Sequence, residues 1–113
     1  MKKIDLRDRA LAAEEGEYVL GLDDTGSHAC YMIYGTLKPG EKDRLVKPGH
    51  GHEEIVAAMK GDLRLSGARE GTLKEGEAFH IVDETTVYLE NPAGTEVVYI
   101  ISGGHSADGH HHH

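Results

Sequence analysis

Two histidines and a glutamate alternate along one short segment of the chain, at His50, His52 and Glu54. Successive side chains of a β-strand point to opposite faces, so a strand across this segment would place all three on one face. If that face is the interior of a small barrel, two imidazoles and a carboxylate converge on one point. Nitrogen and oxygen donors of this kind bind divalent transition metals. The spacing therefore predicts a metal site.

A third imidazole, that of His80, is the expected fourth ligand. It lies among apolar residues on a predicted strand, where an imidazole needs a partner. Three nitrogens and one carboxylate suit Zn²⁺, Ni²⁺, Fe²⁺ or Mn²⁺. His105 follows the last predicted strand and is the reserve ligand. The competing interpretation leaves His50 and His52 exposed in a loop and makes His80 a hydrogen-bonded core residue.

The elements that must position these residues are short strands. The chain has 15 glycines, which separate runs rich in Val, Ile, Leu, Tyr and Thr, a pattern typical of an all-β fold. The expected strands span 18–22, 29–37, 54–60, 63–65, 78–82, 86–90 and 96–102. Segments 23–27 and 41–47 are expected as a turn and a loop. Only 6–15 is predicted to be helical, as one short N-terminal helix.

Size and charge restrict the class of protein. With 113 residues the chain can form one compact domain, and its net charge of −8 argues against nucleic acid and anionic membranes as partners. No apolar run approaches the roughly 20 residues that span a bilayer. The single cysteine, Cys30, cannot form an internal disulfide, which favours a cytoplasmic protein, and it is expected in the core. Open sheet edges in so short a chain favour a homodimer.

The chain ends in four histidines, His110 to His113. We therefore divide it into one domain over residues 1–105 and a His-rich tail over 106–113. The tail has two interpretations that the sequence leaves open. It is either an expression tag or a native segment that collects nickel or cobalt.

Two motifs resemble those of small single-domain cupins. The run His50-Gly51-His52-Glu53-Glu54 follows the turn at Pro39-Gly40, and Gly61 comes seven residues after Glu54. Gly76 and Asn91 have the fifteen-residue separation of the second motif. The resemblance implies an all-β double-stranded β-helix, the cupin jelly-roll barrel, with a divalent metal next to a small-molecule pocket.

The chain departs from the family pattern at the implied ligands. The resemblance would place them at positions 48, 50, 54 and 87, where this sequence has Pro48, His50, Glu54 and Val87. Three hypotheses remain: a metal-dependent enzyme of unknown substrate, a non-catalytic ligand-binding cupin with a degenerate site, and a nickel- or cobalt-handling protein that uses its tail. Tyr31 and Tyr34 lie on opposite faces of one expected strand, so one of them is predicted to point into the barrel.

Overall fold

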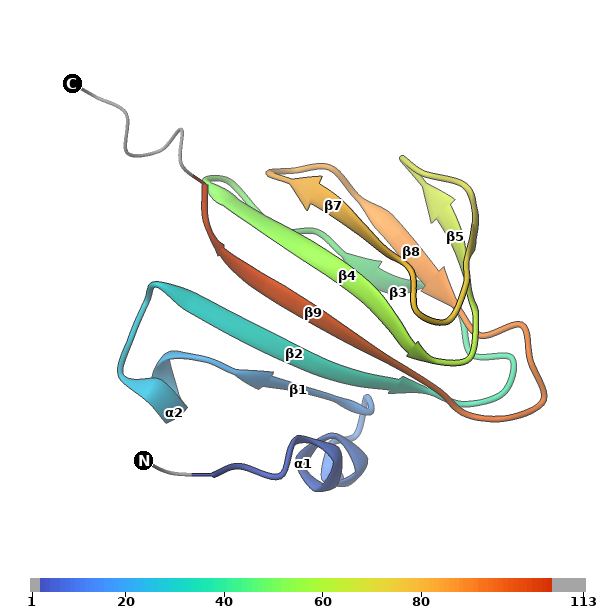
Figure 1. Cartoon of the computed structure of the whole chain (residues 1–113), viewed down its shortest axis with the longest axis horizontal. Coiled ribbons are helices and arrows are strands. Elements are labelled where there is room, and N and C mark those ends of the chain that lie inside the picture. Colours follow the sequence, from blue (N-terminus) through green and yellow to red (C-terminus); the bar gives the residue numbers. More distant parts are fainter. Residues whose placement is uncertain (1–2, 107–113) are drawn as a thin grey trace.

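Two antiparallel sheets face each other in the computed structural model, which describes residues 3–106 (Figure 1). The first sheet has the strand order β1-β2-β9-β4-β7, and the second has the order β3-β8-β5-β6. The strands are β1 (Glu17–Leu20), β2 (Cys30–Leu37), β3 (Arg44–Val46), β4 (His52–Lys60), β5 (Leu63–Gly67), β6 (Gly71–Leu73), β7 (Ala78–Val82), β8 (Val87–Glu90) and β9 (Val97–His105). This arrangement confirms the predicted all-β jelly roll.

Apolar side chains from both sheets fill the space between them. In β4 and β7 every second residue is buried, as expected for strands with one face on a core. Val56 and Ile101 of the first sheet and Leu63, Val87 and Leu89 of the second are at most 2% exposed. Burying each such side chain contributes about 1.5–3 kcal/mol, so this interior accounts for much of the stability of the fold.

The N-terminal helix α1 (Leu6–Ala12) confirms the predicted helix, although it ends three residues earlier than expected. Asp5 caps it, since its side chain accepts a hydrogen bond from the Asp8 backbone N–H at 2.9 Å. Ala10 is fully buried where α1 packs on β1 and β2. Among the described residues, no helix is long and apolar enough to cross a bilayer.

Three local predictions were wrong. The expected turn over 23–27 contains the short helix α2 (Leu22–Thr25), which ends at Gly26 in the left-handed conformation. The expected loop over 41–47 contains β3, because three residues are too few to show an alternating pattern. Cys30 begins β2 and is exposed rather than part of the core.

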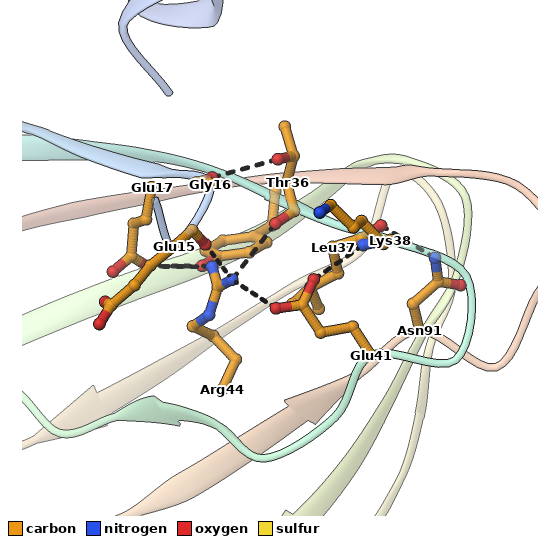
Figure 2. Close-up of polar contacts among 10 residues, drawn as sticks. Glu15, Gly16, Glu17, Thr36, Leu37, Lys38, Glu41, Arg44 and Asn91 are labelled. Atoms are coloured by element: carbon orange, nitrogen blue, oxygen red, sulfur yellow. Dashed lines mark hydrogen bonds and ion pairs between the residues drawn. The ribbon is translucent and has the colours of Figure 1, made fainter. Parts of the chain in front are cut away.

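A buried asparagine ties together the loops at one end of the barrel. Asn91 is fully buried, and its side-chain N–H groups donate to the carbonyl oxygens of Leu37 at 3.0 Å and Thr95 at 2.8 Å. Its backbone N–H donates to the carbonyl of Glu41 at 2.8 Å. Figure 2 shows Asn91 and Glu41 on either side of the Leu37–Lys38 segment. These bonds fix the loop that leads into β3.

Candidate functional site

His52 and Glu54 share the inner face of β4, as the alternating pattern predicted. The strand begins at His52, which is half-buried, and Glu54 is 6% exposed. The intervening Glu53 points to the outer face, where it pairs in register with Val82 of β7. Two of the four expected ligands therefore lie on the same strand face.

His50 does not join them, because it precedes the strand. It lies exposed in a turn between Gly49 (φ 97°) and Gly51 (φ 77°), whose left-handed conformations break the two-residue alternation. The β7–β8 turn holds this loop: the Gly51 N–H donates to Oδ1 of Asp83 at 3.1 Å. The His52 ring contacts the loop as well, with Nδ1 3.1 Å from the His50 carbonyl oxygen.

His80 lies on the opposite face of the sheet from Glu54. Its neighbours Phe79 and Ile81 point into the core, so the alternation of β7 turns His80 outward. There its Nε2 is 2.8 Å from Oε1 of Glu53. The expectation that His80 meets Glu54 across the cavity was therefore wrong: it meets the neighbouring glutamate on the outer surface.

Glu54 makes one hydrogen bond that the sequence did not predict. The hydroxyl of Tyr31 in β2 donates to Oε2 of Glu54 at 2.5 Å. Tyr31 is thus the tyrosine of its strand that turns inward. Its ring lies over Gly103 of β9, where a Cβ would overlap the ring atoms. The glycine is what allows the phenol to cross one strand and reach Glu54.

His105, the reserve candidate, lies beside this pair. It is opposite His52 in the β4–β9 register, and the two ring centroids are 4.8 Å apart. The Tyr31 and His52 ring centroids are 6.3 Å apart. We call Tyr31, His52, Glu54, Gly103 and His105 the His52-end cluster. It brings together two imidazoles, a phenol and a carboxylate.

Burial dominates the electrostatics of this cluster. It raises the pKa of Glu54; the Tyr31 hydrogen bond and the charge of His52 act in the opposite direction, and Glu17 adds to the rise. Burial also raises the pKa of Tyr31, and Glu54 raises it further. The phenol therefore stays protonated, and its hydroxyl donates a hydrogen bond to the carboxylate.

These residues do not fit the four-ligand metal centre that the family resemblance implies. Position 87 is a valine that is 1% exposed and packs in the core, and position 48 is a proline. Across residues 3–106, no three His, Cys, Asp or Glu side chains are grouped so that they could hold a metal ion. The C-terminal histidines at 110–113 lie outside the described residues.

Two hollows are lined in part by residues of β7, the strand that pairs with β4. One, of about 310 Å³, is lined by the outward residues Glu53, Ile55, His80 and Ser102 together with Glu54, Gly103 and Gly104, and it opens on the outer face of the first sheet. The other, of about 240 Å³, opens at the edge of β7. Its walls include the core residues Phe79, Ile81 and Val87 together with Thr85 and Arg69.

Comparison with solved structures shows what the fold is similar to. A cupin protein from Bacteroides fragilis matches with a TM-score of 0.72 and 13% identity, over 94% of this chain and 85% of the other. A protein from Thermus thermophilus matches with a TM-score of 0.69 and 17% identity, over 93% and 98% of the two chains. Oxalate oxidase matches with a TM-score of 0.67 and 20% identity, over 83% of this chain.

The chain spans only about half the length of the oxalate oxidase it matches, 53%. The sequence matches no protein-family model and no curated protein. At these identities the likeness is one of fold, and fold alone assigns no reaction.

Proposed function

Because the chain has the cupin fold, we propose that it binds a small molecule at the His52 end of its barrel, through Glu54 and Tyr31. The proposal is a binding function that does not depend on the four-ligand metal centre of the family resemblance. It corresponds to the ligand-binding cupin with a degenerate site among the sequence-based hypotheses.

The observation that carries the proposal is the buried carboxylate of Glu54 on the inner face of β4, which no arginine or lysine among the described residues neutralises. Only three polar residues are buried among those described, and Glu54 is the one that is ionisable. Burying a carboxylate costs several kcal/mol unless it is paired, so an apolar residue would stabilise the fold better. A buried carboxylate at a barrel end, hydrogen-bonded to one phenol, is typical of a ligand contact.

The proposal can be tested by NMR on the full ¹⁵N-labelled chain with a set of small probes. We would titrate propylammonium, propylguanidinium, propionamide and propionate separately and follow the backbone amides. At least one probe should shift the amides of Tyr31, Glu54 and Gly103. If no probe shifts them, or shifts occur only around the outer-face hollow at Ile55 and Ser102, the proposed site is wrong.

Metal binding is the second candidate, and the pairing of the His52 and His105 rings next to Glu54 favours it. Of the sequence-based metal set of His50, His52, Glu54 and His80, we keep His52 and Glu54 as ligands for this candidate, since His50 precedes β4 and His80 lies on the outer face. The test is elemental analysis of protein purified without a nickel resin, with and without residues 110–113. One equivalent that is lost in Glu54→Ala and retained in His80→Ala would support a metal at the His52 end.

The same measurement tests the tail hypothesis. A protein that collects nickel or cobalt through its C-terminal histidines should bind more than one equivalent. Most of that metal should disappear when residues 110–113 are deleted. Metal content that does not change on deletion would contradict a role for the tail.

We also propose that the protein is a cytoplasmic homodimer. The described part of the chain exposes large apolar side chains on the first sheet, among them Ile55 at 51% and Val82 at 38%. Pairing two copies would cover such a face. Light scattering coupled to size-exclusion chromatography would test the dimer, and a monomer at micromolar concentration would contradict it.

A further inference from the structure

We propose that the ligand presents an organic cation, an ammonium or a guanidinium, to Glu54 and Tyr31. This inference rests on the proposed function and names the chemical class of its ligand. The argument comes from a repeated arrangement within the first sheet, one copy of which already holds a guanidinium.

Two rows of three residues cross the inner face of the first sheet in the same way. In the Glu17 row, Glu17 of β1 is opposite Gly35 of β2, which is opposite Tyr99 of β9. In the Glu54 row, Glu54 of β4 is opposite Gly103 of β9, which is opposite Tyr31 of β2. The antiparallel pair β2–β9 relates the rows: each strand gives a tyrosine to one row and a glycine to the other.

The contacts repeat along with the register. A Cβ at Gly35 would overlap the Tyr99 ring, as a Cβ at Gly103 would overlap the ring of Tyr31. Each tyrosine lies over the glycine and donates its hydroxyl proton to the glutamate beyond it, at 2.5 Å in both rows. Both rows therefore place a phenol oxygen and a carboxylate side by side.

The Glu17 row binds the guanidinium of Arg44. Nη1 of Arg44 donates to the Tyr99 hydroxyl oxygen at 2.5 Å and is 3.8 Å from Oε2 of Glu17. Nη2 donates to the Glu15 carbonyl and to Oε2 of Glu41, the latter at 3.2 Å. Figure 2 shows the guanidinium between Glu15, Glu17, Thr36 and Glu41. A cation thus completes this phenol–carboxylate pair.

The Glu54 row has the same acceptors, but no arginine or lysine among the described residues bonds to them, and the positive group that acts on Glu54 is His52, without a hydrogen bond to it. Tyr31 donates to Glu54 and receives no hydrogen bond there. Oε1 of Glu54 has no hydrogen-bond partner within residues 3–106. Because every buried side-chain oxygen in that range has a partner, Oε1 must be in contact with solvent. Two acceptors therefore remain available from outside the barrel.

The chemistry of those acceptors selects the ligand class. A carboxylate oxygen and a phenol oxygen that already donates its proton can only accept, so the ligand must supply donors. Charged donors form the stronger bonds to a carboxylate, and a guanidinium or ammonium offers several. An anion would be repelled by the buried charge of Glu54 and by the net charge of −8 on the chain.

The test compares probes of one size and different charge on the full chain. Propylguanidinium and propylammonium are the cations, propionamide is the neutral probe and propionate the anion. Binding is measured by NMR titration at pH 7.5 and low salt. We expect the cations to shift the amides of Tyr31, Glu54 and Gly103, and propionate to leave them in place.

Variants localise the effect to the Glu54 row. In Glu54→Gln, which keeps the shape and removes the charge, cation affinity should fall about tenfold or more. Glu53→Gln is the matched control, since it removes the adjacent charge on the opposite face, and its affinity should equal that of the parent. Tyr31→Phe removes the second acceptor and should weaken cation binding several-fold. If Glu54→Gln does not fold, Tyr31→Phe still tests whether the Glu54 row binds the cation.

The outcomes separate this inference from the proposed function. If propionate or propionamide binds at these amides and the cations do not, the cation class is wrong and the binding site stands. If no probe binds there, both fail. If cations bind equally well to the parent, Glu54→Gln and Tyr31→Phe, the assignment to the Glu54 row is overturned. If Zn²⁺ binds at these amides, and propylguanidinium at millimolar concentration neither binds nor displaces it, a metal is the cation and the organic class is wrong.

Discussion

The Glu17 row and the Glu54 row have the same arrangement of residues and differ in whether the chain supplies a guanidinium to the phenol–carboxylate pair. Each has a tyrosine crossing a glycine to reach a glutamate. In the Glu17 row the chain itself supplies a cation, Arg44, and Tyr99 is fully buried. In the Glu54 row Tyr31 is half-buried, and one carboxylate oxygen has no hydrogen-bond partner within residues 3–106 and is not fully buried. The same local geometry therefore serves as an internal anchor in one row and as an open acceptor in the other.

The difference arises from the segments that surround each row. The Glu17 row is enclosed by the α1–β1 connection, which supplies the Glu15 carbonyl, and by the loop that carries Glu41 into β3. At the Glu54 row the adjacent loop contains Gly49, His50 and Gly51, and it supplies no guanidinium. Because it is enclosed, the phenol–carboxylate pair of the Glu17 row contributes to stability. The pair of the Glu54 row is more accessible and is therefore a candidate for binding.

The largest expected effect comes from removing the internal cation. Arg44→Met should lower the free energy of unfolding by about 3 kcal/mol or more, because it leaves the Glu17 carboxylate without its ion-pair partner and the Glu15 carbonyl without its donor in a largely buried place. Urea denaturation followed by circular dichroism measures this change. Arg64→Met is the matched control.

Arg64 forms an ion pair with Glu90 at 3.5 Å, but its side chain is 58% exposed. A pair of this kind contributes about 0–1 kcal/mol, so the control should lie close to the parent protein. Equal losses in the two variants would contradict the view that the Glu17 row is an anchor.

Substitution of the two glycines should give the next largest loss of stability. As with the cation, the loss should be larger in the Glu17 row than in the Glu54 row. Gly35→Ala forces the fully buried Tyr99 out of its place, which we expect to cost about 2–3 kcal/mol. Gly103→Ala displaces Tyr31, which can turn toward solvent, so the cost should be about 1 kcal/mol. Thermal and urea unfolding of both variants measure the difference, and a reversed order would show that the Glu54 row is the more rigid.

The fold was predictable from the sequence because the patterns that indicate its strands and turns lie within short segments of the chain. Glycine and proline turns separated the strands, and β4 and β7 alternate as their apolar residues indicated. For the candidate site, the alternation of side chains along β4 correctly placed His52 and Glu54 on one face. It failed at His50, because two left-handed glycines interrupt the strand, and the sequence alone did not show where β4 would begin.

The rest of the site depends on contacts between distant strands. Tyr31 meets Glu54 only because the β2–β9 and β4–β9 registers bring both opposite Gly103. His80 was assigned to the wrong face because its apolar neighbours were taken to surround it, whereas in a strand they mark the face that it avoids. Strict alternation applied to Phe79, His80 and Ile81 would have indicated the outer face.

The raised pKa of Glu54 predicts a pH dependence that is specific to its row. Burial favours the protonated form of this carboxyl, so its contribution to stability is complete below the ordinary pKa of 4.5 and is lost as pH rises through the raised value. Glu54→Gln cannot ionise. Its stability relative to the parent should therefore increase between about pH 4 and pH 7.

Urea unfolding at a series of pH values measures this difference. Glu53→Gln, on the outer face, should show no comparable increase. A difference between Glu54→Gln and the parent that is constant with pH would mean that the carboxylate is already compensated in the free protein. In that case the two rows would be electrostatically alike, and the case for an external cation would weaken.

The smallest expected effect compares the two phenols. Tyr99→Phe removes the hydroxyl between Arg44 and Glu17, which stay 3.8 Å apart, and should cost about 1–2 kcal/mol. Tyr31→Phe removes one hydrogen bond, from a half-buried phenol to Glu54, and should cost about 0.5–1 kcal/mol. Chemical denaturation resolves the two values. The loss should be larger for Tyr99→Phe because this phenol is fully buried and bonds to the Arg44 guanidinium as well as to Glu17. Adding propylguanidinium should stabilise the parent protein more than the Tyr31→Phe variant.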